Sequence, residues 1–76
     1  MLEEFPQELI QKIRQENPHF DKIIERHEEL KKIVKDVEEG REHMEDLELE
    51  KLKLEKLKLK DEAYAIVMQY KKEHGL

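Results

Sequence analysis

Four histidines are the side chains of this 76-residue chain that are most suited to binding a metal ion. A pair of ligands on one helical face needs a spacing of three or four residues, as in the zinc motif HExxH. His19, His27, His43 and His74 have no partner at that spacing, and the HEE at residues 27–29 is not followed by a second histidine. The sequence therefore predicts no metal site.

His27 stands apart from the other histidines because it falls within a stripe of apolar residues. A histidine in such a position is usually structural, and we expect an imidazole that is hydrogen-bonded at a helix interface. The alternative is a pH-sensitive contact, since histidine is the side chain whose charge changes near neutral pH.

The chain lacks the side chains that most often act as nucleophiles in enzymes, since it has no cysteine, serine or threonine. It also has only two glycines and no glycine-rich phosphate loop. The 20 acidic residues are so numerous that no pair stands out for acid–base chemistry. A thin helical protein offers little volume for a desolvated pocket. We therefore expect no enzymatic activity, no cofactor and no small-molecule substrate.

The densest positive charge lies in the segment KLKLEKLKLK, residues 51–60, which has five lysines and one glutamate, a balance of +4. Residues 1–50 carry 16 acidic and 8 basic side chains, a balance of −8. A lysine cluster of this kind can bind nucleic acid or anionic lipid. The segment has no arginine and no aromatic residue for base stacking, however, and the whole chain is acidic, with a net charge of −5.

We favour a partner for these lysines inside the molecule. In an antiparallel helical pair, Lys53 and Lys58 come level with Glu29 and Glu25. Together with Glu28, these glutamates would offset much of the positive charge. Binding of nucleic acid or lipid through residues 51–60 is the alternative.

The same segment alternates like a strand, but its leucines do not keep the phase of one. Leu52 and Leu54 are followed by Leu57 and Leu59, so half of them would change faces of a sheet. Leucine, lysine and glutamate are good helix formers, and the segment has no β-branched or aromatic residue. We expect a helix from about residue 43 to about residue 73, ended by Gly75.

Two further helices are expected upstream. Pro6 suits a first helical turn and begins a short helix at residues 6–16, while Asn17 and Pro18 suit the cap and first position of a helix at residues 18–39. Gly40 ends that helix, with a turn at residues 40–42. A short connection makes neighbouring helices antiparallel. The predicted fold is all-α: one domain over residues 1–76, an antiparallel helical hairpin with a short N-terminal helix.

The last helix carries apolar residues on two sides. At about 100° per residue, one side has Leu49, Leu52, Leu59, Ala63, Ile66, Val67 and Tyr70, and the other has Leu47, Leu54, Leu57, Tyr64 and Met68. A single partner helix covers only one of them. The short N-terminal helix is expected on the far end of the long helix, in its own chain or in a neighbouring one.

The second side predicts an interaction surface. We expect its members, Leu47, Leu54, Leu57, Tyr64 and Met68, to form the contact, with Lys51, Lys53 and Lys58 setting the register. The partner would be another copy of the chain, giving a homodimer or a larger helical bundle of the coiled-coil type, or a helix of another protein. The expected function is protein–protein interaction or self-assembly; the alternative is the anionic-surface binder described above.

No segment is long enough to cross a membrane, since the longest apolar run is AYAIVM at residues 63–68. The N-terminus MLEEFPQE is acidic and lacks the features of a secretory signal. We expect a cytoplasmic protein.

Several segments resemble the YdcH-like family, short bacterial proteins that carry a domain of unknown function. The similar segments are EFPQELIQKI (4–13), NPHFDKIIERHEEL (17–30), the turn around EEGRE (38–42) and LEKLKLEKLKLKDEAY (49–64). The most specific of them is KLKLKDE with the following AY. The resemblance implies a small cytoplasmic helical hairpin that often self-associates, and it assigns no functional residues.

Overall fold

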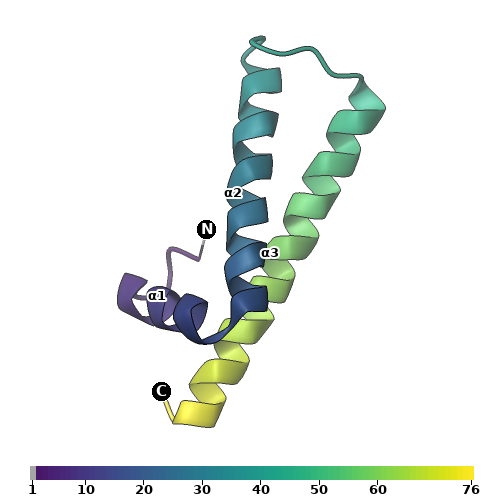
Figure 1. The fold of residues 1–76 in the computed structure, drawn as a ribbon. Coiled ribbons are helices and arrows are strands. Elements are labelled where there is room, and N and C mark those ends of the chain that lie inside the picture. Colours follow the sequence, from purple (N-terminus) through teal and green to yellow (C-terminus); the bar gives the residue numbers. More distant parts are fainter. Residues whose placement is uncertain (1) are drawn as a thin grey trace.

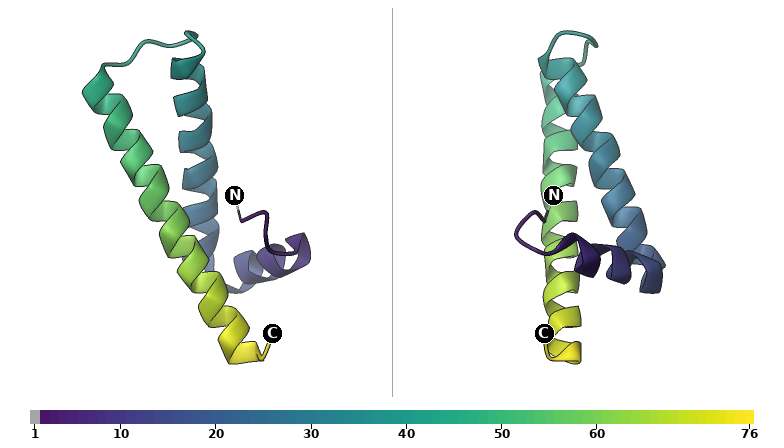
Figure 2. Two further views of the ribbon diagram at one scale, coloured as in Figure 1. Left: turned by 180° about the vertical axis from the view of Figure 1, so that it is seen from behind. Right: turned by 90° about the vertical axis from the view of Figure 1, so that its left-hand side faces the viewer.

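The computed structural model describes residues 2–76, which form three α-helices (Figure 1). They are α1 (Gln7–Glu16), α2 (Pro18–Glu38) and α3 (Asp46–His74). No strand occurs among residues 2–76, so the all-α prediction is confirmed, and residues 51–60 are helical as expected. Helices α2 and α3 run antiparallel, with α1 lying across one end of the pair (Figures 1 and 2).

A single residue, Asn17, separates α1 from α2. Its extended backbone (φ −130°, ψ 97°) ends α1, and its side-chain oxygen accepts a hydrogen bond from the backbone N–H of Phe20 at 3.1 Å. Pro18 follows at the first helical position, where a backbone N–H would have no helical partner. The Asn-Pro pair thus ends one helix and begins the next, as the sequence predicts.

Glycines end both long helices in the left-handed conformation. Gly40, with φ of 80°, follows the end of α2, and Gly75, with φ of 66°, is the C-cap of α3. This conformation favours glycine because it has no Cβ to meet the following carbonyl. Both positions agree with the sequence prediction.

The connection between α2 and α3 is longer than the predicted turn at residues 40–42. Helix α3 begins at Asp46 instead of near residue 43, and residues 43–45 are non-helical. The two helices diverge toward this end of the hairpin, so the chain needs extended residues to pass from one to the other (Figures 1 and 2). Arg41 holds the start of the connection through ion pairs with Asp36 at 2.9 Å and Glu39 at 2.5 Å.

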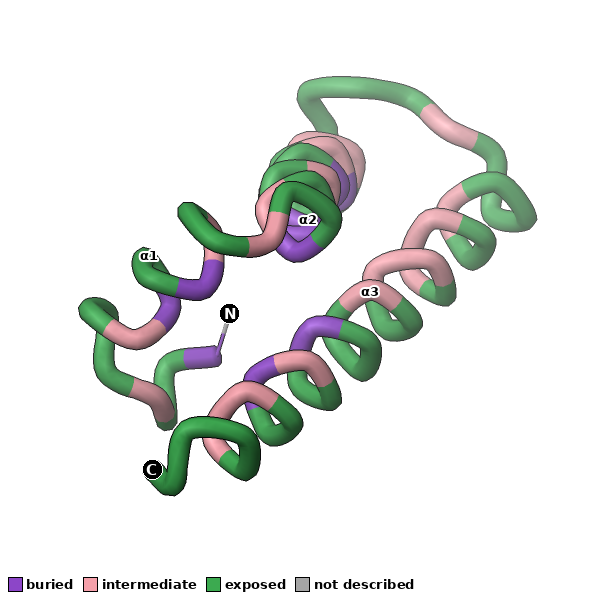
Figure 3. The backbone as a smooth tube through the Cα atoms, turned by 60° about the horizontal axis from the view of Figure 1, so that its bottom comes forward, coloured by how far each residue is buried: buried purple, intermediate pink, exposed green. Residues whose placement is uncertain are grey.

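The core lies at the end of the hairpin where all three helices meet (Figure 3). Its buried members are Leu2, Ile10, Ile13, Phe20, Ile23, Ile24, Ala63 and Val67. Toward the connection, α2 still buries Leu30 and Val34, but no residue of α3 before Ala63 is buried. The molecule is therefore tightly packed at one end and thin at the other.

The N-terminal residues and α1 pack on their own chain. Leu2 is 1% exposed and belongs to the core, and Phe5, half-buried, packs against it. Ile10 and Ile13 are the buried residues of α1, and they join residues of α2 and α3 in the same core. Helix α1 thus contributes to the core on the end of the hairpin where the sequence places it.

Candidate interaction surface

The two apolar sides of α3 have different surroundings. The side predicted to face the hairpin is covered: Ala63 and Val67 are buried, and the others are half-buried, namely Leu49, Leu52, Leu59, Ile66 and Tyr70. The second side is solvent-exposed, with Leu47 at 67%, Leu54 at 52%, Leu57 at 53%, Tyr64 at 43% and Met68 at 44%. We call these five residues the exposed stripe.

The exposed stripe has the spacing of a coiled-coil seam. From Leu47 to Met68 its members are separated by seven, three, seven and four residues. These are the a and d positions of a heptad repeat, which place knobs of one helix into holes of another. The helical angles identify these residues in the sequence, and their regular heptad spacing can also be counted there directly.

Two acidic residues complete the seam. Glu50 and Asp61 fill the remaining heptad positions between Leu47 and Met68, and both are exposed. A polar residue at such a position weakens a coiled coil but restricts the partner and the register that it accepts. Glu50 and Asp61 therefore limit which helix can lie against the stripe.

Lysines flank the seam on both sides. Lys51 and Lys58 occupy the positions next to it on one side, and Lys53 and Lys60 those on the other. Within residues 2–76, the structure gives none of these four an ion pair. The positive charge around the exposed stripe is therefore not offset by direct contacts.

This result corrects the predicted pairing of Lys53 with Glu29 and of Lys58 with Glu25. Glu29 instead contacts Arg26 at 2.8 Å, and Glu25 contacts Arg14. Helix α2 contacts the lysine-rich segment through an arginine: Nε of Arg26 forms an ion pair with the Glu55 carboxylate of α3 at 2.7 Å. The predicted register was off by only one or two residues, but Glu25 and Glu29 form their ion pairs with arginines of α1 and α2 instead of with the lysines of α3.

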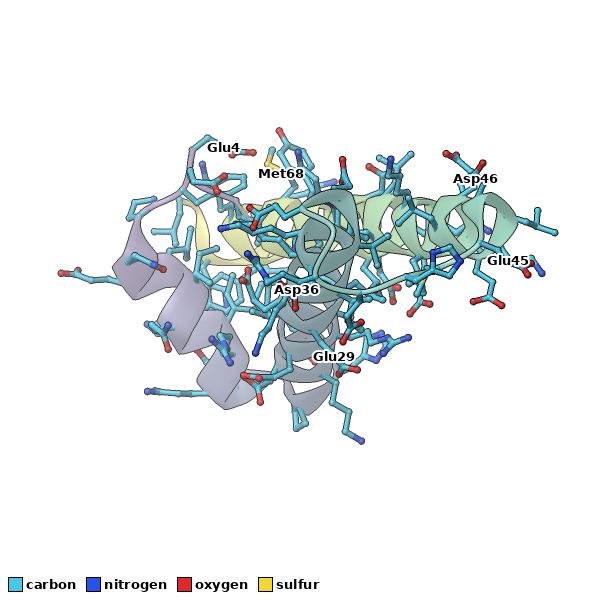
Figure 4. All side chains as sticks on the ribbon, turned by 90° about the horizontal axis from the view of Figure 1, so that it is seen from above. Glu4, Glu29, Asp36, Glu45, Asp46 and Met68 are labelled. Atoms are coloured by element: carbon cyan, nitrogen blue, oxygen red, sulfur yellow. The ribbon has the colours of Figure 1, made fainter. Side chains whose placement is uncertain are left out.

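The C-terminal part of the stripe touches the N-terminal segment. The rings of Phe5 and Tyr64 lie 5.5 Å apart between centroids, and the Lys71 ammonium lies 5.5 Å from the centre of the Phe5 ring. Part of the Tyr64 ring is thus already in contact with a residue of the same chain. Met68 and Asp46 project from the side of α3 that faces away from α1 (Figure 4). The freest apolar part of the stripe is Leu47, Leu54 and Leu57.

His27 is buried in the α2 stripe, as the sequence predicts, at 6% exposure. The expected hydrogen bond is absent, however: among residues 2–76, its Nδ1 has no hydrogen-bond partner, and the Glu28 carboxylate is 3.8 Å away. Burial lowers the pKa of His27 from its ordinary value, and Glu28 partly opposes this effect. An imidazole in this position favours its neutral form at neutral pH.

The described residues 2–76 contain no group of three or more side chains placed to hold a metal ion. Nor does any helix in that part of the chain have the length and apolarity needed to span a bilayer.

The fold and the exposed stripe define a small all-α protein, a helical hairpin whose longest helix has one uncovered apolar face. The chain belongs to the family described as protein of unknown function (DUF465), which matches residues 20–67. This is the YdcH-like family, so the resemblance seen in the sequence is confirmed. The match covers most of α2, the connection and most of α3. No curated protein and no solved structure matches the chain.

Proposed function

We propose that this protein is an interaction or self-assembly module that docks an amphipathic helix on the exposed stripe of α3. One observation carries the proposal: the large apolar side chains exposed on the helices of residues 2–76 are five in number, and all of them belong to one heptad seam. Scattered exposed leucines need no explanation, whereas an ordered apolar strip marks a binding surface. The proposal includes no catalytic role.

The stripe alone supports weak and reversible docking. Burying a large apolar side chain contributes about 1.5–3 kcal/mol, and roughly half of each of these side chains is already covered. The gain from five residues is then about 5 kcal/mol, which is close to the lower end of the roughly 4–15 kcal/mol that association costs. Additional contacts from the partner are needed for tight binding.

A synthetic heptad peptide tests this proposal. The peptide is about four heptads long, with leucine at a and d and glutamine at e and g, so that its flanks are neutral. It carries a fluorophore and is kept far more dilute than the protein, so that it does not pair with itself. We expect its anisotropy to rise as the protein is added.

Substitution of Leu54→Glu with Leu57→Glu should weaken this binding at least about tenfold, because two charges would enter an apolar contact. The control is Gln11→Glu with Leu76→Glu, which adds the same charges at exposed positions outside the stripe. Binding that survives the stripe substitutions, or no association of the native protein with the peptide or with itself, would exclude the stripe as a docking surface.

The second candidate is binding of nucleic acid or anionic lipid through residues 51–60. It is supported by the finding that Lys51, Lys53, Lys58 and Lys60 have no ion pairs among the described residues. Such binding must fall steeply with salt, whereas apolar docking persists. Titration with a nonspecific oligonucleotide and with acidic vesicles at low and high salt separates the two functions.

A further inference from the structure

A second copy of the chain is a poor occupant for the exposed stripe. On the helices of residues 2–76, only α3 carries large exposed apolar residues, so an apolar contact between copies has to pair α3 with α3. Between residues 51 and 60, both flanks of the seam carry only lysine. Either orientation of two α3 helices therefore brings lysines of one copy against lysines of the other.

The acidic seam positions add to this repulsion. In a parallel pair, Asp61 faces Asp61 of the other copy, and Glu50 faces Glu50. In the antiparallel register that sets Leu54 against Leu57 and Leu47 against Tyr64, Glu50 faces Asp61. This register aligns the apolar residues of the two copies with each other. The best apolar alignment therefore also places like charges in contact.

We infer that the stripe binds a helix of a different protein, one with an apolar a/d seam and acidic residues at its e and g positions. This inference rests on the proposed function and names its partner by charge complementarity. Glutamates on the partner would meet the four flanking lysines, which the structure leaves without ion pairs. The selection is electrostatic, and the apolar seam supplies the docking itself.

Two more dilute, labelled peptides test the partner's chemistry. Both keep leucine at a and d; one has glutamate and the other lysine at e and g. At low salt, the glutamate peptide should bind the native protein at least about tenfold more tightly than the lysine peptide, since four flanking pairs change sign. At about 1 M salt, where charges are screened over about 3 Å, the two affinities should converge.

A variant of the protein isolates the flanks. Replacing Lys51, Lys53, Lys58 and Lys60 together by glutamine should remove the preference while preserving binding of the neutral peptide. These lysines make no ion pair within residues 2–76 and glutamine is a good helix former, so the fold should persist, which circular dichroism checks.

Each remaining outcome contradicts the inference in a different way. A native protein that sediments as a dimer, and as a monomer after Leu54→Glu with Leu57→Glu, has a second copy on the stripe. Equal binding of both charged peptides at low salt means that the flanks select nothing, although the proposed function stands. A further control is a glutamate peptide with serine in place of its leucines, and another is an oligonucleotide. If either binds as tightly as the full glutamate peptide, the surface is a general anion-binding surface. Failure of the neutral peptide counts against the proposed function itself.

Discussion

Arg26 of α2 and Glu55 of α3 form a two-point ion pair, with Nε 2.7 Å from Oε2 and Nη2 3.3 Å from Oε1. Seven residues earlier on α2 and seven residues later on α3, Nε2 of His19 lies 2.6 Å from Oε1 of Glu62. The two contacts have the same register, because each step forward on α2 is matched by one step back on α3. The His19–Glu62 contact lies at the three-helix end of the hairpin, next to the core residues Phe20 and Ala63, and the Arg26–Glu55 contact lies seven residues nearer the connection on each helix.

We predict that the contributions of Arg26 and Glu55 to the free energy of unfolding are coupled. The hydrogen bond from Arg26 lowers the pKa of Glu55, so the charged form of Glu55 is favoured in the folded protein. Arg26→Gln and Glu55→Gln should each lower the urea midpoint slightly, and the double variant should lose less than the sum of the two. The coupling should shrink in high salt because both side chains are partly exposed. Strictly additive losses would show that the pair contributes nothing.

The core at the three-helix end should dominate stability. Phe20 is fully buried in the cluster shared by α1, α2 and α3. Phe20→Ala should cost about 3–5 kcal/mol, which approaches the whole stability of a small domain, so the variant should be largely unfolded by far-ultraviolet circular dichroism. Leu57→Ala, at a half-exposed position of similar helix propensity, is the control and should change stability by less than about 0.5 kcal/mol.

Acid should destabilise the fold through His27. Because its pKa is lowered in the folded protein, the unfolded chain binds more protons below the ordinary pKa of about 6.5. Stability should therefore decrease as the pH falls through 6.5 and continue to decrease until the folded-state pKa is passed. Lys56 of α3 and Lys31 of α2 act in the same direction as burial, whereas Glu28 opposes them.

Urea denaturation at about pH 7.5 and pH 5.5 measures this dependence, both limits lying about one unit from the ordinary pKa. The His27→Leu variant should have a flatter profile than the native chain, since leucine has no proton to gain. A native profile that is flat over this interval, or one that keeps its slope in His27→Leu, would assign the acid sensitivity to other groups or to none.

The connection should tolerate alanine at Gly40 only at a cost. Nothing lies within 4 Å of a Cβ built there, so the penalty is purely that of the left-handed backbone, at φ of 80°. Gly40→Ala should cost about 1 kcal/mol, and Gly40→Asn less, because asparagine enters this conformation more readily. Thermal unfolding of the three proteins tests the order. Equal stability for alanine and glycine would mean that the connection refolds around the substitution.

The sequence predicted those features that depend on local chemistry. Asn17, Pro18, Gly40 and Gly75 mark helix ends because capping and left-handed turns need specific residue types. The division of α3 into two apolar sides also followed from helical periodicity alone. The predicted start of α3 was wrong, because that position depends on how far apart the helices are at the connection. This distance is set by packing and not by local sequence.

Other features missed by the sequence interpretation involve contacts across the molecule. Glu25, Glu28 and Glu29 were each level with α3, but periodicity does not reveal that arginines hold two of them. The contact of Phe5 with Tyr64 was missed as well, because the N-terminal residues have no regular pattern. Whether the exposed stripe binds a partner is a prediction that remains to be tested by the peptides described above.

The burial of Leu2 determines how the protein should be handled in experiments. Its side chain is 1% exposed and its φ is 62°, whereas Leu76 at the opposite terminus is 68% exposed. We expect an affinity tag or fluorescent fusion joined at the amino end to disturb the packing of Leu2, whose side chain belongs to the core only a few residues from Phe5 and α1. The same fusion joined after Leu76 extends into solvent. Labels for microscopy, surface immobilisation or purification therefore belong at the carboxyl end.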